Sequence, residues 1–377
     1  MKDPIRLMRQ AVAQGVFPGA VLFVQAGGLV LLHEAFGEAD VFARQPMSLD
    51  TVFDLASLTK PLATAPAVLK LVQDGRMRLD DNLGDILPVL HGTDKHWITP
   101  GQLLLHTSGL PAHREFFLAL AVLPPSRRRD ALLRLLAEEP LEYESGTKQV
   151  YSDLGYMILK YLVEMLSGKR LDAFLQDTLY GPLGIDNLFF IDLEHGGESP
   201  AIPPAGSFAA TENCSRRSCL IKAVVHDDNA FEAGGIAGQA GLFGTTRAVA
   251  RFLNMLLDIY HGKITTDVLS RETVGLMLAV RPGLSRTYGF DTPDKEKSSS
   301  GRMFSTASVG HLGFTGVSLW LDVNRDILVL LFTNRIHPDR NNFKIKEFRP
   351  LIHDSIMTAI TGRGYNPVKP AGRQKKQ

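Results

Sequence analysis

Strong β-strand patterns lie near the two ends of this 377-residue chain, and that separation constrains the fold more than any other feature. The segment GAVLFVQAGGLVLLHEAFG, which begins at Gly19, contains two apolar runs joined by Ala26-Gly27-Gly28, a pattern typical of a β-hairpin. The segment GVSLWLDVNRDILVLLFTN, which begins at Gly316, predicts a second pair of strands. Because the residues between them are mainly helical in pattern, we predict an α+β fold with one antiparallel sheet assembled from both termini and flanked by helices.

The middle of the chain predicts a mostly helical insertion. Amphipathic segments such as SRRRDALLRLLAEEP and SDLGYMILKYLVEMLSG recur there. The glycine-rich segment 234–244 has no strand–turn–helix frame, so it predicts close backbone packing or a loop rather than a dinucleotide site. We therefore predict a sheet domain from residues 1–75 and 230–365, a helical domain from 76–229 with a ligand cleft between the two, and a disordered tail over 366–377.

Composition excludes several classes of partner. The net charge of +1 gives no electrostatic basis for binding nucleic acid or an anionic membrane. No apolar run approaches the ~18 residues needed to span a bilayer, so we expect no transmembrane segment. Charged residues interrupt the N-terminal segment MKDPIRLMRQAVAQG, where a signal peptide needs an apolar core. We therefore expect a cytoplasmic protein, or a periplasmic or extracellular one if a leader was trimmed.

Cysteine and histidine usage gives no sign of a metal centre. Cys214 and Cys219 stand alone in CSRRSC, which predicts free thiols, with a short-loop disulfide as the alternative. The other candidate zinc ligands show no convincing ligand spacing, and they are His91, His96, His113 and His226-Asp227-Asp228. We therefore expect neither a metal nor a cofactor.

The segment ASLTKPL at 56–62 contains Ser-x-x-Lys, and a second copy lies at Ser145-Gly146-Thr147-Lys148. Ser57 stands between a strand-like segment and a helical pattern, where its hydroxyl lies near unpaired backbone N–H groups. Lys60 follows one helical turn later and therefore lies on the same face. Ser145 lies in a polar loop and predicts a turn. We therefore predict that Ser57, beside Lys60, is a nucleophile.

A serine hydroxyl needs a base beside it to act as a nucleophile. A free lysine, with a pKa near ~10.4, holds its proton at neutral pH unless burial or another cation lowers that value. A tyrosinate is an alternative base, and a neighbouring ammonium would favour it. The residues near Ser57 do not decide between a lysine and a tyrosine as the base. We therefore expect a third ionisable group, from elsewhere in the chain, to lie beside Ser57 and Lys60. No Gly-x-Ser-x-Gly occurs, which argues against an α/β-hydrolase.

Five motifs occur in an order that resembles the serine β-lactamase and penicillin-binding-protein superfamily: SLTK at 57–60, HTSGLP at 106–111, YSDLGY at 151–156, GPLGI at 181–185 and GHLGFTG at 310–316. The chain is most similar to the class C branch and to the related esterases and D-Ala-D-Ala peptidases, over roughly residues 5–360. The resemblance implies a β-lactamase/transpeptidase-like fold and an acyl-enzyme mechanism.

The resemblance also implies a role for each matching residue. Ser57 would attack a carbonyl with assistance from Lys60, and Tyr151 would act as general base and later as general acid. His311 would occupy the position of the lysine in the family's Lys-Thr-Gly motif. The backbone N–H groups of Ser57 and Phe314 would form the oxyanion hole, in which each donor is often worth ~3 kcal/mol.

Three positions depart from the family pattern. Asp153 replaces the usual asparagine, and a carboxylate there could hold Lys60 as an ammonium and shift the base role toward the tyrosine. His311 and Leu312 replace a lysine and a threonine that normally help to bind a substrate carboxylate. Histidine is mostly neutral above pH ~6.5, and leucine donates no hydrogen bond. We therefore expect His311 and Leu312 to recognise a substrate carboxylate weakly and penicillins to be hydrolysed inefficiently. Leu312 and the adjacent Gly313 are candidates for the wall of the substrate cleft.

Together these features predict a serine hydrolase that forms an acyl-enzyme on Ser57 and hydrolyses small esters or amides. Carboxylesterase or D-Ala-D-Ala carboxypeptidase activity ranks ahead of true β-lactamase activity. The expected partner is a small-molecule ester, amide, or β-lactam or peptidoglycan-like substrate. The alternative is a penicillin-binding-type protein that binds such a ligand, or is acylated by it, without efficient turnover.

Overall fold

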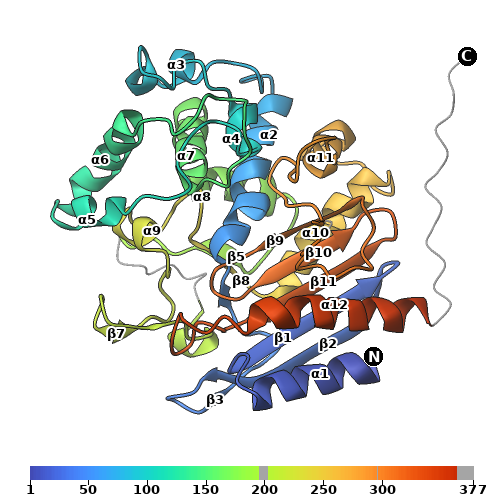
Figure 1. Ribbon diagram of the computed structural model, residues 1–377. Coiled ribbons are helices and arrows are strands. Elements are labelled where there is room, and N and C mark those ends of the chain that lie inside the picture. The colour runs from blue at the N-terminus through green and yellow to red at the C-terminus, as the bar shows by residue number, and fades with distance from the viewer. Residues whose placement is uncertain (195–202, 295, 363–377) are drawn as a thin grey trace, which may run out of the picture.

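The computed structural model describes residues 1–194, 203–294 and 296–362, so the predicted disordered tail lies outside the described residues (Figure 1). Six strands of the described chain form the main sheet in the order β3-β2-β1-β11-β10-β9, with every neighbouring pair antiparallel. Their bounds are β1 Gly19–Ala26, β2 Leu29–Asp40, β3 Gln45–Pro46, β9 Ser308–Leu312, β10 Ser318–Asp322 and β11 Ile327–Thr333. Strands β1 and β11 pair along their lengths, with Ala20 opposite Thr333. The prediction of one sheet built from both termini is confirmed.

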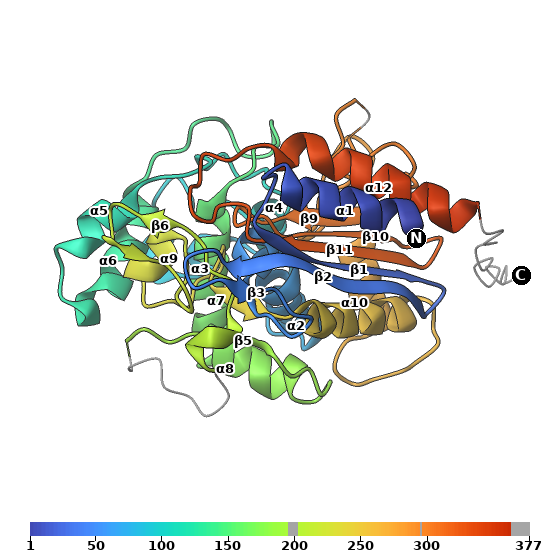
Figure 2. The same ribbon diagram turned by 90° about the horizontal axis from the view of Figure 1, so that it is seen from below.

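Helices cover both faces of this sheet. Successive side chains of β1 alternate between two apolar clusters, with Leu22 in one and Phe23 in the other. Helices α1 (Lys2–Ala13) and α12 (Ile345–Thr361) lie on the first face, and α10 (Thr246–Tyr260) packs on the second (Figure 2). Burial on both sides explains why β1 and β11 are almost continuously apolar.

Helices from the middle of the chain gather beside the sheet, at the upper left of Figure 1. Their bounds are α2 Ala65–Gln73, α3 Leu83–Ile86, α4 Pro100–Leu104, α5 Phe116–Ala121, α6 Pro125–Glu138, α7 Asp153–Ser167, α8 Leu171–Leu175 and α9 Asp228–Glu232. Helix α11 (Arg271–Leu278) comes later in the chain and lies at the upper right of Figure 1. The Ser152 side chain caps α7 by accepting the Gly155 N–H, and Gly168 ends it with a φ of 69°. Of the helices in the described ranges, none is both long and apolar enough to cross a membrane.

Short strands link the helical region to the main sheet. Strands β4, β8 and β5 form a three-stranded sheet in that order, and β6 pairs with β7. Their bounds are β4 Phe53–Asp54, β5 Leu188–Phe190, β6 Asn213–Cys214, β7 Cys219–Leu220 and β8 Leu242–Gly244. The glycine-rich segment 234–244 leads into β8, and a Cβ atom at Gly238 would overlap the backbone of Tyr156. The predicted close backbone packing is therefore confirmed.

Candidate active site

Ser57 lies in a 3₁₀ turn, Ala56–Leu58, shortly after β4. Ala56 has a positive φ of 46°, a conformation that costs free energy for a residue with a side chain. Asp54 stabilises this bend because its buried carboxylate accepts the Ala56 N–H at 2.8 Å and the His226 N–H at 2.7 Å. Burial raises the pKa of Asp54 to about 6. The turn presents Ser57 to a cavity rather than to the core.

The Lys60 side chain is fully buried, and its amino group contacts three acceptors. Nζ lies 3.2 Å from Ser57 Oγ, 2.7 Å from Asp153 Oδ1 and 3.0 Å from the Gln239 carbonyl oxygen. Three acceptors match the three N–H donors of an ammonium. Burial lowers the pKa of Lys60 from its usual value, and the Asp153 carboxylate opposes that shift. Lys60 therefore gives up its proton more readily than a surface lysine does.

Asp153 begins α7 and is the counterion of Lys60. Burial alone would raise its pKa, but the Lys60 ammonium and the His113 side chain together lower the pKa of Asp153 to about 2. His113 Nδ1 lies 3.6 Å from Asp153 Oδ2, whereas Lys60 contacts the other oxygen, Oδ1. Asp153 is therefore ionised at neutral pH.

Tyr151 donates its phenolic hydrogen to Ser57 Oγ at 2.9 Å. Burial, followed by the negative charge of Asp153, raises the pKa of Tyr151 well above its ordinary value. Tyr151 is therefore a neutral phenol in the resting site. The His106 ring packs on it at 4.7 Å between centroids, and His106 Nδ1 accepts the Ser152 N–H at 3.0 Å. This packing holds the phenol in place beside the serine.

The second Ser-x-x-Lys copy lacks this geometry. Ser145 Oγ is buried without a hydrogen-bond partner in the described part of the chain. Lys148 Nζ lies instead 5.7 Å from the ring centroid of Tyr143. Of the two serines, Ser57 is therefore the one with an amino group and a phenol at hydrogen-bond distance.

His311, on strand β9, is buried and uncharged at neutral pH. Its Nδ1 lies 3.0 Å from the Leu312 carbonyl oxygen, and because a carbonyl only accepts, Nδ1 carries the hydrogen. Nε2 is then an acceptor, and it has no partner among the described residues. Burial, with the nearby charges of Lys60 and Arg286, lowers the pKa of His311 to about 4. The position that holds a cation in the family motif therefore holds a hydrogen-bond acceptor.

Phe314 lies in the turn that follows β9. Within the described ranges its N–H donates to no protein acceptor, whereas its carbonyl oxygen accepts two hydrogen bonds from Arg335. A Cβ atom at Gly313 would crowd the Leu55 carbonyl oxygen, so this turn lies directly against the segment that carries Ser57. The Phe314 N–H is therefore available to a substrate oxygen beside Ser57.

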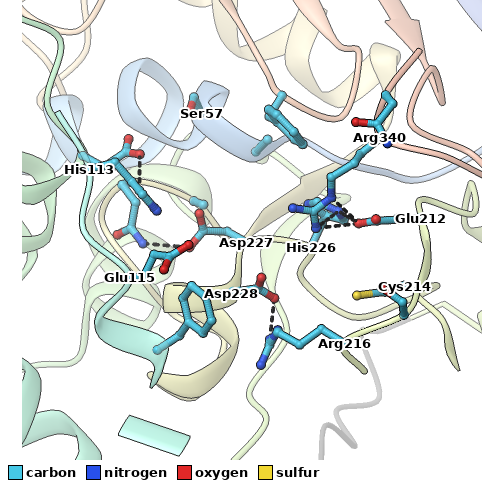
Figure 3. Close-up of a pocket in the computed structure, with 18 of the residues that line it drawn as sticks. Ser57, His113, Glu115, Glu212, Cys214, Arg216, His226, Asp227, Asp228 and Arg340 are labelled. Atoms are coloured by element: carbon cyan, nitrogen blue, oxygen red, sulfur yellow. Dashed lines mark hydrogen bonds and ion pairs between the residues drawn. The ribbon is translucent and has the colours of Figure 1, made fainter. Parts of the chain in front are cut away.

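The larger of two cavities at Ser57 has a volume of about 740 Å³. Figure 3 shows Ser57 at its upper edge, with His113 on one side and the cluster of Arg340, Glu212 and His226 on the other. Glu212 Oε2 lies 2.5 Å from Arg340 Nη2 and 2.8 Å from His226 Nε2. The Glu212 carboxylate and the Arg340 guanidinium neutralise each other, but Glu115 and Asp227 also line this cavity, which we call the large lobe, so it suits a polar group without negative charge.

The second cavity has a volume of about 290 Å³, and we call it the small lobe. Its lining includes Ser57, Tyr151 and Phe314, which it shares with the large lobe, and His311, Leu312, Gly313, Asp291, Arg335, Phe343, Ile345, Lys346 and Arg349. Asp291 is paired with Arg286. Arg335, Lys346 and Arg349 contact no carboxylate in the described chain, so the small lobe is electropositive.

Three residues at the site have positions that the sequence alone does not predict. Gln239 contacts Lys60 through its backbone carbonyl, which every residue carries, so no sequence signal could have found it. Its side-chain amide donates to Asp227 Oδ1 at 3.1 Å, and burial, followed by the charge of Asp153, raises the pKa of Asp227. The sequence presents Asp227 and His113 only as candidate metal ligands, whereas in the structure both line the large lobe.

Comparison with known proteins places the chain in one family. The family described as Beta-lactamase matches residues 5–352. The N-acetylmuramyl-L-alanine amidase of Bacillus subtilis (strain 168) is 30% identical, over 94% of this chain and 87% of the relative. The putative D-alanyl-D-alanine carboxypeptidase of Escherichia coli (strain K12) is 28% identical, over 88% of this chain and 81% of the relative.

Solved structures show the same fold. The octameric penicillin-binding protein homologue from Pyrococcus abyssi has a TM-score of 0.69 at 20% identity and covers 98% of this chain and 78% of its own. EstCE1, a hydrolase with promiscuous acyltransferase activity, has a TM-score of 0.68 at 21% identity and covers 93% of this chain and 98% of its own. The predicted β-lactamase/transpeptidase-like fold and the predicted class of enzyme, a serine hydrolase, are confirmed. The chain belongs to the beta-lactamase family.

Proposed function

We propose that this chain hydrolyses an amide bond in a peptidoglycan-derived fragment through an acyl-enzyme on Ser57. The observation that carries the proposal is the position of Ser57 Oγ, 3.2 Å from Lys60 Nζ and 2.9 Å from the Tyr151 oxygen. A nucleophile, a group that can take its proton and a group that can give one therefore meet at the junction of two cavities. The names of the bacterial relatives, an amidase and a putative carboxypeptidase, favour an amide over an ester.

Lys60 in its neutral form is the better candidate for the base. Burial lowers the pKa of Lys60 and raises that of Tyr151, so the first proton that this coupled pair loses comes from Lys60. Neutral Lys60 would take the proton of Ser57 as Oγ bonds to the carbonyl carbon. Tyr151, which keeps its proton, would donate it to the leaving nitrogen as the C–N bond breaks. Water would then hydrolyse the ester on Ser57 by the reverse proton path.

The oxyanion of each tetrahedral intermediate needs donors that are already in place. The N–H groups of Ser57 and Phe314 supply them in this proposal, because Phe314 N–H has no competing acceptor in the described chain and its turn packs against the Ser57 segment. A substrate carbonyl between the two donors would face Ser57 Oγ.

The charges of the two lobes suggest how the substrate lies. Arg349 is buried, its Nε has no hydrogen-bond partner in the described chain, and burial beside Arg335 lowers its pKa to about 9. A substrate carboxylate would relieve this unpaired charge, so the leaving amine would be an amino acid or short peptide bound in the small lobe. Both relatives are named for an amide whose nitrogen belongs to alanine, which fits this charge. The acyl half would lie in the polar large lobe.

Two amides test the proposal: N-acetylmuramyl-L-alanyl-D-isoglutamine, and an N-acylated peptide ending in D-Ala-D-Ala. Release of an amine from either one, lost in Ser57→Ala, would support the proposal, and the substrate cleaved faster would identify the acyl group. Intact-protein mass measured during the reaction should show a transient adduct on Ser57. A lasting adduct without amine release would favour the binding protein without turnover. Neither an adduct nor an amine would refute peptidoglycan amides as substrates.

A further inference from the structure

We propose that Asp85, His91 and His96 form a binding site for a divalent transition metal, with Zn²⁺ the favoured ion. The three residues lie between α2 and α4, in and after α3, which stands at the top of Figure 1. One donor atom from each lies within 4.8 Å of the other two. None of the three lines either cavity at Ser57, so the site is separate from the proposed chemistry.

The donor set selects the kind of ion. Two imidazole nitrogens and one carboxylate oxygen suit Zn²⁺ and its neighbours, whereas Ca²⁺ and Mg²⁺ prefer oxygen donors alone. His96 Nε2 lies 3.6 Å from Asp85 Oδ1. Ligand atoms around tetrahedral Zn²⁺, with bonds of about 2.1 Å, stand ~3.4 Å apart, so this pair is nearly at the spacing required.

His96 is the fixed member of the site. It is 8% exposed, and its backbone carbonyl accepts the Gly84 N–H at 3.0 Å. A Cβ atom at Gly84 would overlap His96 Nδ1, so the ring packs tightly against this glycine and Nδ1 has no hydrogen-bond partner in the described chain. Nε2 is therefore the nitrogen directed toward Asp85. Glycine at position 84 is what makes room for the ring.

The other two ligands are exposed and can close on His96 by side-chain rotation. The Asn82 side chain already donates to Asp85 Oδ2 at 3.0 Å, which leaves Oδ1 facing the histidine. The His91 ring lies 4.9 Å from the His96 ring between centroids. Because the ion binds the folded segment, it would stabilise a stretch of chain whose regular structure is limited to the short α3 and one 3₁₀ turn.

Trp97 offers an optical signal for this site. Its ring lies 4.3 Å from that of His96 and is 73% exposed, whereas the other tryptophan, Trp320, is 2% exposed in the main sheet. Chelator-treated full-length protein should bind one Zn²⁺ per chain in calorimetry and unfold at a higher temperature with Zn²⁺. Ni²⁺ should quench the fluorescence of Trp97, and added Zn²⁺ should restore it by competition.

Variants decide whether these residues are the ligands. His91→Ala and Asp85→Ala remove exposed side chains, and each should weaken Zn²⁺ binding by about tenfold or more. His261→Ala is the matched control, since His261 follows a helix end as His91 does and should leave binding unchanged. Trp97→Phe should abolish the quenching but keep the calorimetric binding. No stoichiometric binding at millimolar Zn²⁺, or wild-type affinity in both ligand variants, would overturn the proposal.

Discussion

Lys60 Nζ lies 2.7 Å from Asp153 Oδ1, although the two residues are 93 positions apart in the sequence. The contact joins the first residue of the helical segment Lys60–Thr64, just after the Ser57 turn, to the first residue of α7, so it ties the sheet side of the molecule to its helical region. Removing one partner of a buried ion pair typically lowers the free energy of unfolding by about 3–5 kcal/mol. That is similar to the effect of replacing a large apolar side chain in the core by alanine. The pair therefore both holds the site together and sets the protonation state of the group beside Ser57.

Ser57→Ala should abolish amide hydrolysis and labelling by a fluorophosphonate probe, because the nucleophilic oxygen is lost. Turnover and intact mass after labelling are the measurements. Ser145→Ala is the matched control, since Ser145 also belongs to a Ser-x-x-Lys sequence but makes no hydrogen bond in the described chain. Activity retained in Ser57→Ala would remove Ser57 from the mechanism.

Tyr151→Phe should lower kcat by about 10²-fold, because the leaving nitrogen loses its proton donor. The acid limb of the pH–rate profile should persist, since Lys60 remains as the base. Steady-state kinetics across pH measures both effects. Tyr143→Phe removes a buried hydroxyl that lines neither lobe and should have wild-type kinetics. Loss of the acid limb in Tyr151→Phe would move the base role to the tyrosine.

Asp153→Asn should move the acid limb of kcat/KM to lower pH. The carboxylate opposes the effect of burial on Lys60, so its removal lowers the pKa of Lys60 further and leaves more of the neutral base at a given pH. Glu115→Gln removes a charge from the large lobe without a contact to Lys60 and should leave the limb in place. A limb that moves to higher pH would contradict the assignment of Lys60.

His311→Lys should speed acylation by penicillins about tenfold, because a charge-assisted hydrogen bond to their carboxylate replaces a neutral acceptor. The rate of adduct formation by intact mass is the readout. His311→Gln keeps the site neutral and should give no gain. If the lysine and glutamine variants react equally, position 311 does not meet that carboxylate.

Lys346→Ala should raise KM about threefold to fivefold for a substrate whose leaving group carries a free carboxylate, since an ion pair with an exposed lysine contributes up to ~1 kcal/mol. The same peptide with an amidated C-terminus should be unaffected. Lys344→Ala is the control, because Lys344 bonds to the Gln14 carbonyl and does not line the small lobe. Equal effects on both peptides would place the carboxylate elsewhere.

Much of the fold was predictable because its signals are local. The glycine turn at Ala26-Gly27-Gly28 and the continuous apolar runs of β1 and β11 are each visible in consecutive residues, and the structure contains them. Strands β4, β6 and β7 are two residues long, too short for any period, and they form only because neighbouring segments supply hydrogen-bond partners. The spacing of Ser57 and Lys60 was equally local, since one helical turn brings their side chains together.

By itself, the sequence determined which reactive side chains are present, because the residue type fixes their chemistry. It also determined which close neighbours along the chain share a face, because helix and strand geometry fixes that within a few residues. Tertiary packing decided the protonation states. Burial from distant segments makes Lys60 a weaker base and Tyr151 a neutral donor, and it leaves the acceptor nitrogen of His311 without a partner among the residues that the structure describes. A pKa depends on desolvation and on charges within a few ångströms, and both are set by which remote segments come together.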